Sequence, residues 1–294
     1  MRLFMNTNKR LTALIFILFA LSLAGCTSSP ASTKNAKIKS GKDITFFVAT
    51  DVHYLAKSLT DNGEAFQKFI SGGDGRQLNY ISEIMDAFTN DIKKKKGDVL
   101  IVSGDLTTNG EEDSHLEFAK KLKKIEENGT SVFVIPGNHD ILNPFARGFK
   151  NSNQYVVDYI KKKDLEKIYK DFGYSEAISR DTNTLSYLAS PSEDIWLLML
   201  DTARYKDNIQ KGQPRLDGEI NEGTLEWIKE CSDLAKKNNA QIIAVMHHNL
   251  IDHSKIIKDG FTINNSKKVL ELFESFGIKL ALTGHTHQQD IQFL

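Results

Sequence analysis

The stretch Ser131-Val-Phe-Val-Ile-Pro-Gly-Asn-His-Asp140 decides the fold, because a short apolar run ends abruptly in polar residues. Its β-branched residues, bounded by Pro and Gly, predict a buried strand that is followed at once by a loop. Asn138, His139 and Asp140 then lie on the loop at the C-terminal end of that strand. In an open α/β sheet, this end is where ligands bind.

The same pattern recurs in four other apolar runs, each followed directly by Asp or His, with or without an intervening Gly. The runs are Ile44–Thr50 before Asp51 and His53, Val99–Ser103 before Gly104 and Asp105, Gln241–Met246 before His247 and His248, and Ile278–Thr283 before Gly284, His285 and His287. Side chains in extended chain alternate faces with a period of two, so Asp51 with His53, and His285 with His287, can aim at one point. These spacings are typical of metal ligands.

Composition limits the class of protein and its partners. Lys and Arg total 38 and Asp and Glu total 38, so the formal net charge is zero. A balanced chain offers no basic stripe for a phosphate backbone, and we expect no nucleic-acid polymer as a partner. A length of 294 residues, 40% hydrophobic residues and alternating strand and helix patterns predict one large α/β domain with a substantial core.

The N-terminus has the features of a targeting segment. Basic residues precede the apolar stretch 11–23, which is short for a transmembrane helix and typical of a signal peptide. It runs into Leu23-Ala-Gly-Cys26, which resembles a bacterial lipobox and so implies cleavage before Cys26 and lipid attachment to it. We expect a signal peptide over 1–25, a flexible linker over 26–42, and a lipid-anchored protein on the extracytoplasmic face of a bacterial cell membrane.

The remaining chain, 43–294, is predicted to form the catalytic domain, with two interruptions of its strand and helix pattern. Residues 54–77 form a long loop after the first strand, where loops shape substrate access. Residues 141–181 form an insertion that is expected to cap the site and limit substrate size. Amphipathic helices are predicted over 78–95 and 111–128.

Other polar residues are assigned ordinary structural roles. Cys231 falls on the apolar face of a predicted helix, which favours a buried structural thiol over a nucleophile. Asp201 follows an apolar run without a partnering His, and His115 lies in a predicted helix, so neither is expected to be a ligand. His248 is ambiguous, because it could replace its neighbour His247.

The strand ends together supply two carboxylates, one carboxamide and four imidazoles: Asp51, Asp105, Asn138, His53, His247, His285 and His287. Oxygen and nitrogen ligands without thiolates suit first-row cations such as Mn, Fe, Co, Ni or Zn. Seven ligands are too many for one such ion. With a shared carboxylate they suffice for two ions about 3.5–4 Å apart, which can hold the attacking and leaving oxygens of an in-line phosphoryl displacement.

In order along the chain, these blocks resemble the signature of the calcineurin-like metallophosphoesterase superfamily. That signature is Asp-x-His, Gly-Asp, Gly-Asn-His-(Asp/Glu), His and Gly-His-x-His, and it extends here from Asp51 to His287. The resemblance implies a sandwich of two β-sheets flanked by helices, with a dinuclear metal site.

The resemblance also implies a role for each residue. Asp105 would bridge two metal ions, with Mn, Fe or Zn expected. His139 would contact the substrate phosphate or protonate the leaving oxygen. The first His of a His-His pair is the ligand in this family, which favours His247. The other ligands would divide between a first metal held by Asp51, His53 and His287 and a second held by Asn138, His247 and His285.

The signature, with a cap and without an arginine-bearing protein-phosphatase motif, looks most like the class III cyclic-nucleotide phosphodiesterase branch. We therefore expect hydrolysis of a small phosphodiester, of the cyclic nucleotide or glycerophosphodiester type, by a metal-activated hydroxide. The alternatives are a phosphomonoesterase and a truncated, non-catalytic lipoprotein that binds phosphate. The last rests on Gln288–Leu294, where related enzymes usually continue with strands that finish the second sheet.

Overall fold

The computed structural model describes residues 36–73, 75–253 and 260–293. The chain divides into two compact units, 1–34 and 35–294, and all the described residues belong to the second. The predicted signal peptide and the lipidation site Cys26 lie outside the described residues, as does the linker up to residue 35. Within the described part of the chain, no helix is both long and apolar enough to cross a membrane.

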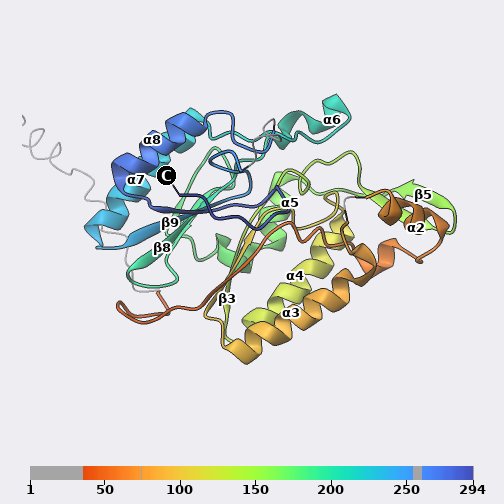
Figure 1. The fold of residues 1–294 in the computed structure, drawn as a ribbon, viewed down its shortest axis with the longest axis horizontal. Coiled ribbons are helices and arrows are strands. Elements are labelled where there is room, and N and C mark those ends of the chain that lie inside the picture. The colour runs from red at the N-terminus through yellow and green to blue at the C-terminus, as the bar shows by residue number, and fades with distance from the viewer. Residues whose placement is uncertain (1–35, 74, 254–259, 294) are drawn as a thin grey trace, which may run out of the picture. The chain divides into compact units, whose positions relative to one another are not determined.

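Two β-sheets form the centre of the second unit (Figure 1). The first is parallel, with the order β1-β2-β3, and consists of β1 (Phe46–Ala49), β2 (Val99–Ser103) and β3 (Ser131–Ile135). The second has the order β10-β9-β8-β7-β6 and consists of β6 (Ser179–Arg180), β7 (Tyr187–Ala189), β8 (Ile195–Leu200), β9 (Gln241–Met246) and β10 (Leu280–Leu282). In it β8, β9 and β10 run parallel, whereas β6 and β7 pair antiparallel.

A shared core joins the two sheets. Apolar residues of β2 and β3 belong to the same buried cluster as Tyr187 of β7 and Leu197 and Met199 of β8. The hydroxyl of Tyr187 donates to the carbonyl of Val134 at 2.8 Å, so a hydrogen bond also crosses between the sheets. Burial on both faces explains why β2 and β3 are continuous apolar runs rather than alternating ones.

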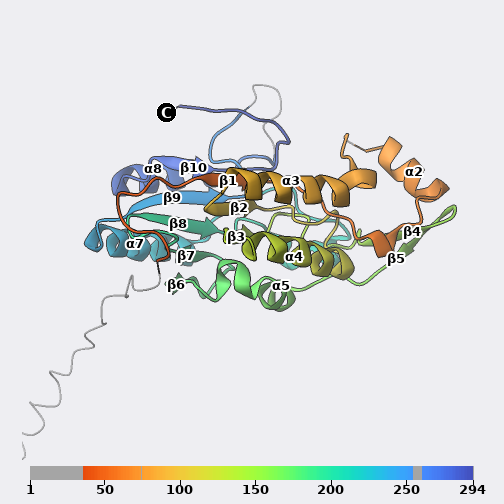
Figure 2. The ribbon, with the colours of Figure 1, turned by 90° about the horizontal axis from the view of Figure 1, so that it is seen from below.

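Helices flank both sheets (Figure 2). α3 (Ile81–Lys95) and α4 (Glu112–Glu126) lie beside the first sheet. α7 (Glu222–Lys237) and α8 (Ser266–Phe276) lie beside the second. A separate apolar cluster includes Trp196 of β8, Trp227 of α7 and Phe273 of α8. The predicted sandwich of two sheets flanked by helices is therefore confirmed.

The helices predicted over 78–95 and 111–128 correspond to α3 and α4, and buried residues spaced three or four apart set the inner face of each. The first three residues of the helix predicted over 78–95 form a separate 3-10 helix, η3 (Leu78–Tyr80). After β8, the 3-10 turn η5 (Tyr205–Asp207) and the short helix α6 (Asn208–Lys211) precede α7.

The first interruption, predicted as a loop over 54–77, contains the 3-10 turn η2 (Lys57–Leu59) and the helix α2 (Glu64–Ser71). α2 packs against a hairpin formed by β4 (Arg147–Lys150) and β5 (Asn153–Val156). Phe66 and Phe69 of α2 contact Phe149 of β4, with ring centroids 5.5 and 4.9 Å away. This small apolar cluster explains why a glycine-rich segment becomes partly helical.

The second interruption, 141–181, was predicted to cap the site, and its parts lie in different places. Its beginning reaches the site loop, where Asn143 donates to the carbonyl of His139 at 3.0 Å. α5 (Lys162–Ile168) packs against α4, and the π-helix η4 (Lys170–Tyr174) packs against β3. Their apolar residues belong to the main core, so a cap stays a prediction for the β4–β5 hairpin alone.

The packing between the sheets predicts the cost of truncating one core residue. Leu197 is fully buried between the layers, and Leu197→Ala should lower the free energy of unfolding by about 2–5 kcal/mol through lost burial and a residual cavity. Leu280 of the edge strand β10 is 49% exposed, and Leu280→Ala should change stability by about 0.5 kcal/mol or less. Urea unfolding of the two variants measures both, and equal losses would contradict the described core.

Candidate metal centre

The candidate ligands all follow the C-terminal ends of parallel strands. Asp51 and His53 follow β1, Asp105 follows β2, Asn138 follows β3, His247 follows β9, and His285 and His287 follow β10. Within each sheet the loops are hydrogen-bonded, from the backbone N–H of Asp51 to the carbonyl of Gly104 at 3.1 Å and from that of Gly284 to the carbonyl of His247 at 2.8 Å. Between the sheets, the backbone N–H of His285 donates to Oδ2 of Asp51 at 2.9 Å. Both sheets therefore contribute to one site.

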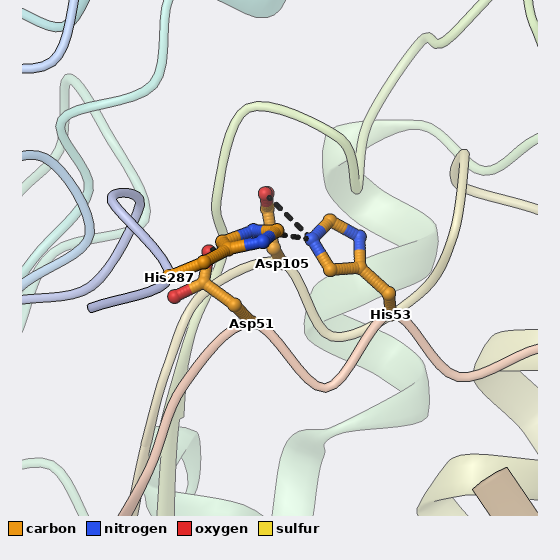
Figure 3. A group of neighbouring side chains, drawn as sticks. All are labelled: Asp51, His53, Asp105 and His287. Atoms are coloured by element: carbon orange, nitrogen blue, oxygen red, sulfur yellow. Dashed lines mark hydrogen bonds and ion pairs between the residues drawn. The ribbon is translucent and has the colours of Figure 1, made fainter. Parts of the chain in front are cut away.

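One group of side chains gathers Asp51, His53, Asp105 and His287, each offering a ligand atom within 4.8 Å of the others. Figure 3 shows these four side chains pointing toward one another from three loops. Nε2 of His53 lies 3.1 Å from Nε2 of His287 and 3.5 Å from Oδ2 of Asp105. Nε2 of His287 lies 3.3 Å from Oδ1 of Asp51. The four ligand atoms thus converge on one point.

A second group shares Asp105 with the first and adds His247 and His285. Nε2 of His247 lies 3.4 Å from Oδ1 of Asp105 and 3.1 Å from Nδ1 of His285. Asn138 joins it, because its Oδ1 is 3.0 Å from the same Nε2. Asp105 therefore presents one carboxylate oxygen to each group, and the structure brings all seven sequence-predicted ligands together.

These groups fit cations. Oδ1 of Asp51 is buried and, among the described residues, lies 3.3 Å from Nε2 of His287 without a well-formed hydrogen bond, whereas Oδ2 accepts from Thr50 and from the backbone of His285. Buried polar atoms are normally hydrogen-bonded, so such an oxygen indicates a missing partner. Facing ring nitrogens about 3.1 Å apart, as in His53 and His287, likewise require a shared proton or a cation. The donor set without thiolates suits borderline first-row metals.

The carboxylates of the site are held ionised. Burial alone would raise the pKa of Asp105, but His247 and His139 lower it well below its usual range. Burial also opposes ionisation of Asp51, yet the neighbouring His287 and the charge of His247 bring its pKa to about 2. Anionic carboxylates are the form that binds a cation.

The imidazoles respond to burial and to these carboxylates. Burial lowers the pKa of His53 to about 3 and that of His285 to about 4, so both rings are neutral near pH 7 and can ligate. Burial has the same tendency at His247, but the charge of Asp105 outweighs it and raises the pKa to about 9. A cation beside Asp105 would take over the role of that proton.

The loops carry backbone strain that the sequence did not reveal. Positive φ angles occur at five of the seven candidate ligands: Asp51 (53°), His53 (46°), Asp105 (47°), His285 (72°) and His287 (52°). Left-handed conformations are costly for non-glycine residues and persist where the surroundings enforce them, as at functional sites. Here the strained turns aim side chains from both sheets at one point.

Glycines permit the close packing of the ligand loops. Gly104 has a φ of 90°, and a Cβ on it would collide with the ring of His247. A Cβ on Gly137 would overlap the side chain and backbone N of Asp105. The close approach that these glycines permit is made by candidate ligands of the protein itself, His247 and Asp105.

His139 belongs to neither group of ligand atoms. Its backbone N–H donates to Oδ1 of Asp105 at 3.0 Å, and its Nδ1 lies 2.8 Å from the carbonyl of Thr108 and 3.2 Å from Oδ1 of Asn109. The side chains of Asn138 and His139 therefore diverge, one toward His247 and the other toward the loop after β2.

His248 is engaged elsewhere, which resolves its ambiguity with His247. Its Nδ1 lies 2.7 Å from Oγ1 of Thr202, and its Nε2 lies 3.1 Å from the carbonyl of Leu216. Three further residues also lie outside the ligand groups: Asp201 accepts from the backbone of Leu185, His115 is buried against Tyr169, and Cys231 is a buried free thiol.

Two residues of the site were missed by sequence reasoning about ligands. Asp140 is buried and accepts from the backbone N–H groups of Leu106, Thr107 and Gly137 at 2.8–3.1 Å, so it fixes the loops after β2 and β3. Arg76 places Nη1 3.0 Å from Nδ1 of His53. The position of Asp140 in the Gly-Asn-His-Asp block was a signal for it, whereas no local pattern marks Arg76.

Residues 44–289 match the family model described as calcineurin-like phosphoesterase. The chain belongs to the calcineurin-like phosphoesterase family. The resemblance of the five sequence blocks is thereby confirmed, and the candidate ligand groups lie at the positions of those blocks.

Curated relatives and a solved structure agree with this family. The chain is 24% identical over 191 residues to a probable cyclic nucleotide phosphodiesterase of Xenorhabdus bovienii. This alignment covers 65% of this chain and 61% of the relative. It is also 23% identical over 207 residues to a probable cyclic nucleotide phosphodiesterase of Coxiella burnetii, and this alignment covers 70% of this chain and 66% of that relative. The chain thus spans less than two thirds of the length of either relative. A dimetal phosphatase from Danio rerio has a similar fold, with a TM-score of 0.53, 14% identity and coverage of 83% of this chain and 82% of that one.

The shared position of Asp105 predicts the effect of neutralising it. Asp105→Asn removes the charge that both ligand groups share, so bound metal should fall from about two ions per chain to about one or fewer. Metal analysis after dialysis measures the ratio, with the exposed residue change Asp171→Asn as the control. Two tightly held ions in Asp105→Asn would contradict the bridging role.

Proposed function

We propose that the chain hydrolyses small-molecule phosphodiesters with two metal ions. The observation that carries the proposal is the placement of Asp105, whose Oδ2 lies 3.5 Å from His53 and whose Oδ1 lies 3.4 Å from His247. A carboxylate shared in this way suits a pair of cations about 3.5–4 Å apart, the spacing used in two-metal hydrolysis of phosphoesters.

The residues divide between the two ions by the contacts described above. The first ion would be held by Asp51, His53 and His287, the second by Asn138, His247 and His285, and Asp105 would touch both. Manganese, iron and zinc suit these donors. When bound to these residues, such ions would make hydroxide available near neutral pH and would offset the charge of the phosphoryl oxygens.

We assign the role of general acid to His139. The carbonyl of Thr108 accepts a hydrogen bond from Nδ1 at 2.8 Å, which fixes the ring and leaves Nε2 as the nitrogen that can release a proton to the substrate. The backbone N–H of His139 donates to Oδ1 of Asp105, so this hydrogen bond fixes the backbone of the proposed acid relative to the proposed bridging carboxylate.

Phosphodiesters are favoured over phosphomonoesters because both curated relatives are named probable cyclic nucleotide phosphodiesterases. The test is hydrolysis of bis(p-nitrophenyl) phosphate and p-nitrophenyl phosphate by protein loaded with Mn, Fe or Zn. We expect a higher kcat/KM for the diester. A higher value for the monoester would move the proposal to a phosphomonoesterase, and no metal-dependent turnover of either would overturn it.

Replacing His139 separates chemistry from metal binding. His139→Ala should keep both ions, because its ring lies outside the ligand groups, while turnover falls by about 10²–10⁴-fold, as for the loss of a positioned acid. The loss should shrink on nitrophenyl esters, whose leaving group needs little protonation. Parallel loss of metal, or equal losses on good and poor leaving groups, would show that His139 is not the acid.

We also propose that the protein is anchored to the extracytoplasmic face of a bacterial membrane through Cys26, on the basis of Leu23-Ala-Gly-Cys26. Cys26→Ser removes the thiol that would carry the lipid. The variant should therefore move from the membrane fraction to the soluble one when the full chain is expressed in a bacterium. Unchanged fractionation would contradict the anchor.

A further inference from the structure

Three buried polar side chains support the Nδ1 side of the His139 ring. They are Asn109, Glu111 and Asn143, which are 9%, 1% and 0% exposed. Asn109 and Glu111 lie in the loop between β2 and α4, and Asn143 follows the Gly-Asn-His-Asp block. None of them belongs to the candidate ligand groups. Buried polar groups are costly to desolvate, so a connected set of them calls for a structural or functional explanation.

The side-chain oxygen of Asn109 faces two donors from the segment that carries His139. Nδ1 of His139 lies 3.2 Å from it, and Nδ2 of Asn143 donates to it at 3.4 Å. Asn143 also donates to the carbonyl of His139 at 3.0 Å. Because Nδ1 is in addition 2.8 Å from the carbonyl of Thr108, two neutral oxygens surround the ring proton. These contacts restrict the rotation of the ring and leave Nε2 for the substrate.

Glu111 in turn holds the backbone of Asn109. Oε2 of Glu111 accepts from the backbone N–H of Asn109 at 3.1 Å. Hydrogen bonds from Ser114 of α4 and from the backbone of Arg147, the first residue of β4, also reach this carboxyl. Burial outweighs them and raises the pKa of Glu111 to about 7. The neutral form is therefore populated near pH 7, and the group serves as a hydrogen-bond acceptor more than as a fixed charge.

A glycine lets this turn approach the backbone of the proposed acid. Gly110 has a φ of 72°, and a Cβ on it would lie 2.9 Å from the carbonyl oxygen of Asp140 and 3.1 Å from that of His139. The carbonyl of Gly110 accepts from the backbone N–H of Ile160 at 3.1 Å, so the turn is also held from its other side. The turn is thus a rigid support placed directly against the loop of His139.

We propose that Asn109 and Glu111 are positioning residues for the acid step. Glu111 fixes the backbone of Asn109, and the side chain of Asn109 holds Nδ1–H of His139, so that Nε2 faces the leaving oxygen. The proton on Nε2 passes to that oxygen as the bond between the oxygen and phosphorus breaks, while Nδ1 keeps its own proton. Both residues act through His139 and touch neither substrate nor metal. This inference rests on the proposed function, which assigns the acid role to His139.

Removing the supporting amide should affect only substrates that need the acid. On diphenyl phosphate, which has a poor leaving group, Asn109→Ala should lower kcat by about 10-fold and leave KM unchanged, as for one lost hydrogen bond to a charged ring. On bis(p-nitrophenyl) phosphate the loss should be about 2-fold or less, because nitrophenolate needs little protonation. Asn109→Asp keeps an acceptor oxygen in place and should recover most of the rate. Steady-state kinetics of the manganese-loaded variants measure all three values.

The effect should vanish when the acid is absent. In the His139→Ala background, Asn109→Ala should cause no further loss on either diester, because the ring that it orients is gone. A general role in shaping the loops of Asp105 and Asn138 would persist in that background and would lower the metal content. A further loss of about 10-fold in the double variant, or a loss of metal, would therefore overturn the positioning role.

Glu111 is tested by the reach of its side chain. Glu111→Asp keeps the carboxyl but withdraws its oxygen from Asn109, and should lower kcat on diphenyl phosphate by about 10-fold. Glu111→Gln keeps the reach and an acceptor oxygen, and should stay within about 3-fold of the wild type. Glu112→Gln and Asn128→Ala change exposed residues at the two ends of α4 and should alter neither rate. Thermal unfolding of every variant checks that the fold is retained.

The Nδ1 proton of His139 provides a readout that needs no turnover. In the zinc-loaded protein its NMR signal, identified by its absence from His139→Ala, should exchange slowly with water, because the proton is buried in hydrogen bonds. Asn109→Ala and Glu111→Asp should speed this exchange by about 10-fold, and the control Glu112→Gln should not.

The outcomes separate this inference from the proposed function. If the exchange rates respond as expected but no diester is hydrolysed, the positioning of the ring stands and the proposed function fails. If diesters are hydrolysed with the expected dependence on His139, but neither rate nor exchange responds to Asn109 and Glu111, the positioning is wrong and the function stands. If His139→Ala keeps the wild-type preference between the two leaving groups, the acid role and its positioning are both overturned.

Discussion

The buried carboxylate of Asp105 is the interaction on which the rest of the molecule depends. It is 1% exposed, and a charge so far from water is tolerated only when compensated by nearby donors or cations. His53 and His247 approach its two oxygens, and the backbone N–H of His139 donates to it. These partners follow strands of both sheets. The layers must therefore be aligned at their C-terminal edge for the charge to be stabilised.

Repulsion between Asp105 and a second buried carboxylate, Asp140, adds to the need for compensating charge. Asp140 lies within the same buried region, and burial together with the charge of Asp105 raises its pKa to about 6. Three backbone donors, including those of Thr107 and Gly137, hold Asp140 in the loop junction nonetheless. Cations bound at the centre would offset the repulsion between these carboxylates, so metal binding and folding stability are coupled in this site.

Much of the centre could be predicted from the sequence because its ligands follow strands whose pattern is strong. Val99–Ser103 and Ser131–Ile135 are unbroken apolar runs, and the polar residues after them had to lie at one sheet edge. The family resemblance implied a sandwich of two sheets, but which strands share a sheet was not predicted, since all of the runs are similarly apolar. Once the pairing is known, the convergence of the ligands follows from topology.

Other features depended on tertiary contacts that leave no local trace. α2 forms in a glycine-rich segment because Phe66 and Phe69 find Phe149, which is about 80 residues away in sequence. The contact between Arg76 and His53 likewise joins residues that no local pattern connects. The left-handed angles at Asp51 and His287 could not be inferred from residue type, because they occur in loops held by contacts between distant parts of the chain, such as the hydrogen bond from the backbone of His285 to Asp51.

The span of the ligand set has a consequence for how the protein acquires its metal. His53 and His287 face each other at 3.1 Å although 234 residues separate them along the chain. Contacts of such long range form late, because most of the chain must be ordered before they can be made. In a nascent or partly unfolded chain, only some of the candidate ligands therefore lie near one another. Tight cation binding then reports that both ends of the domain have reached their final positions.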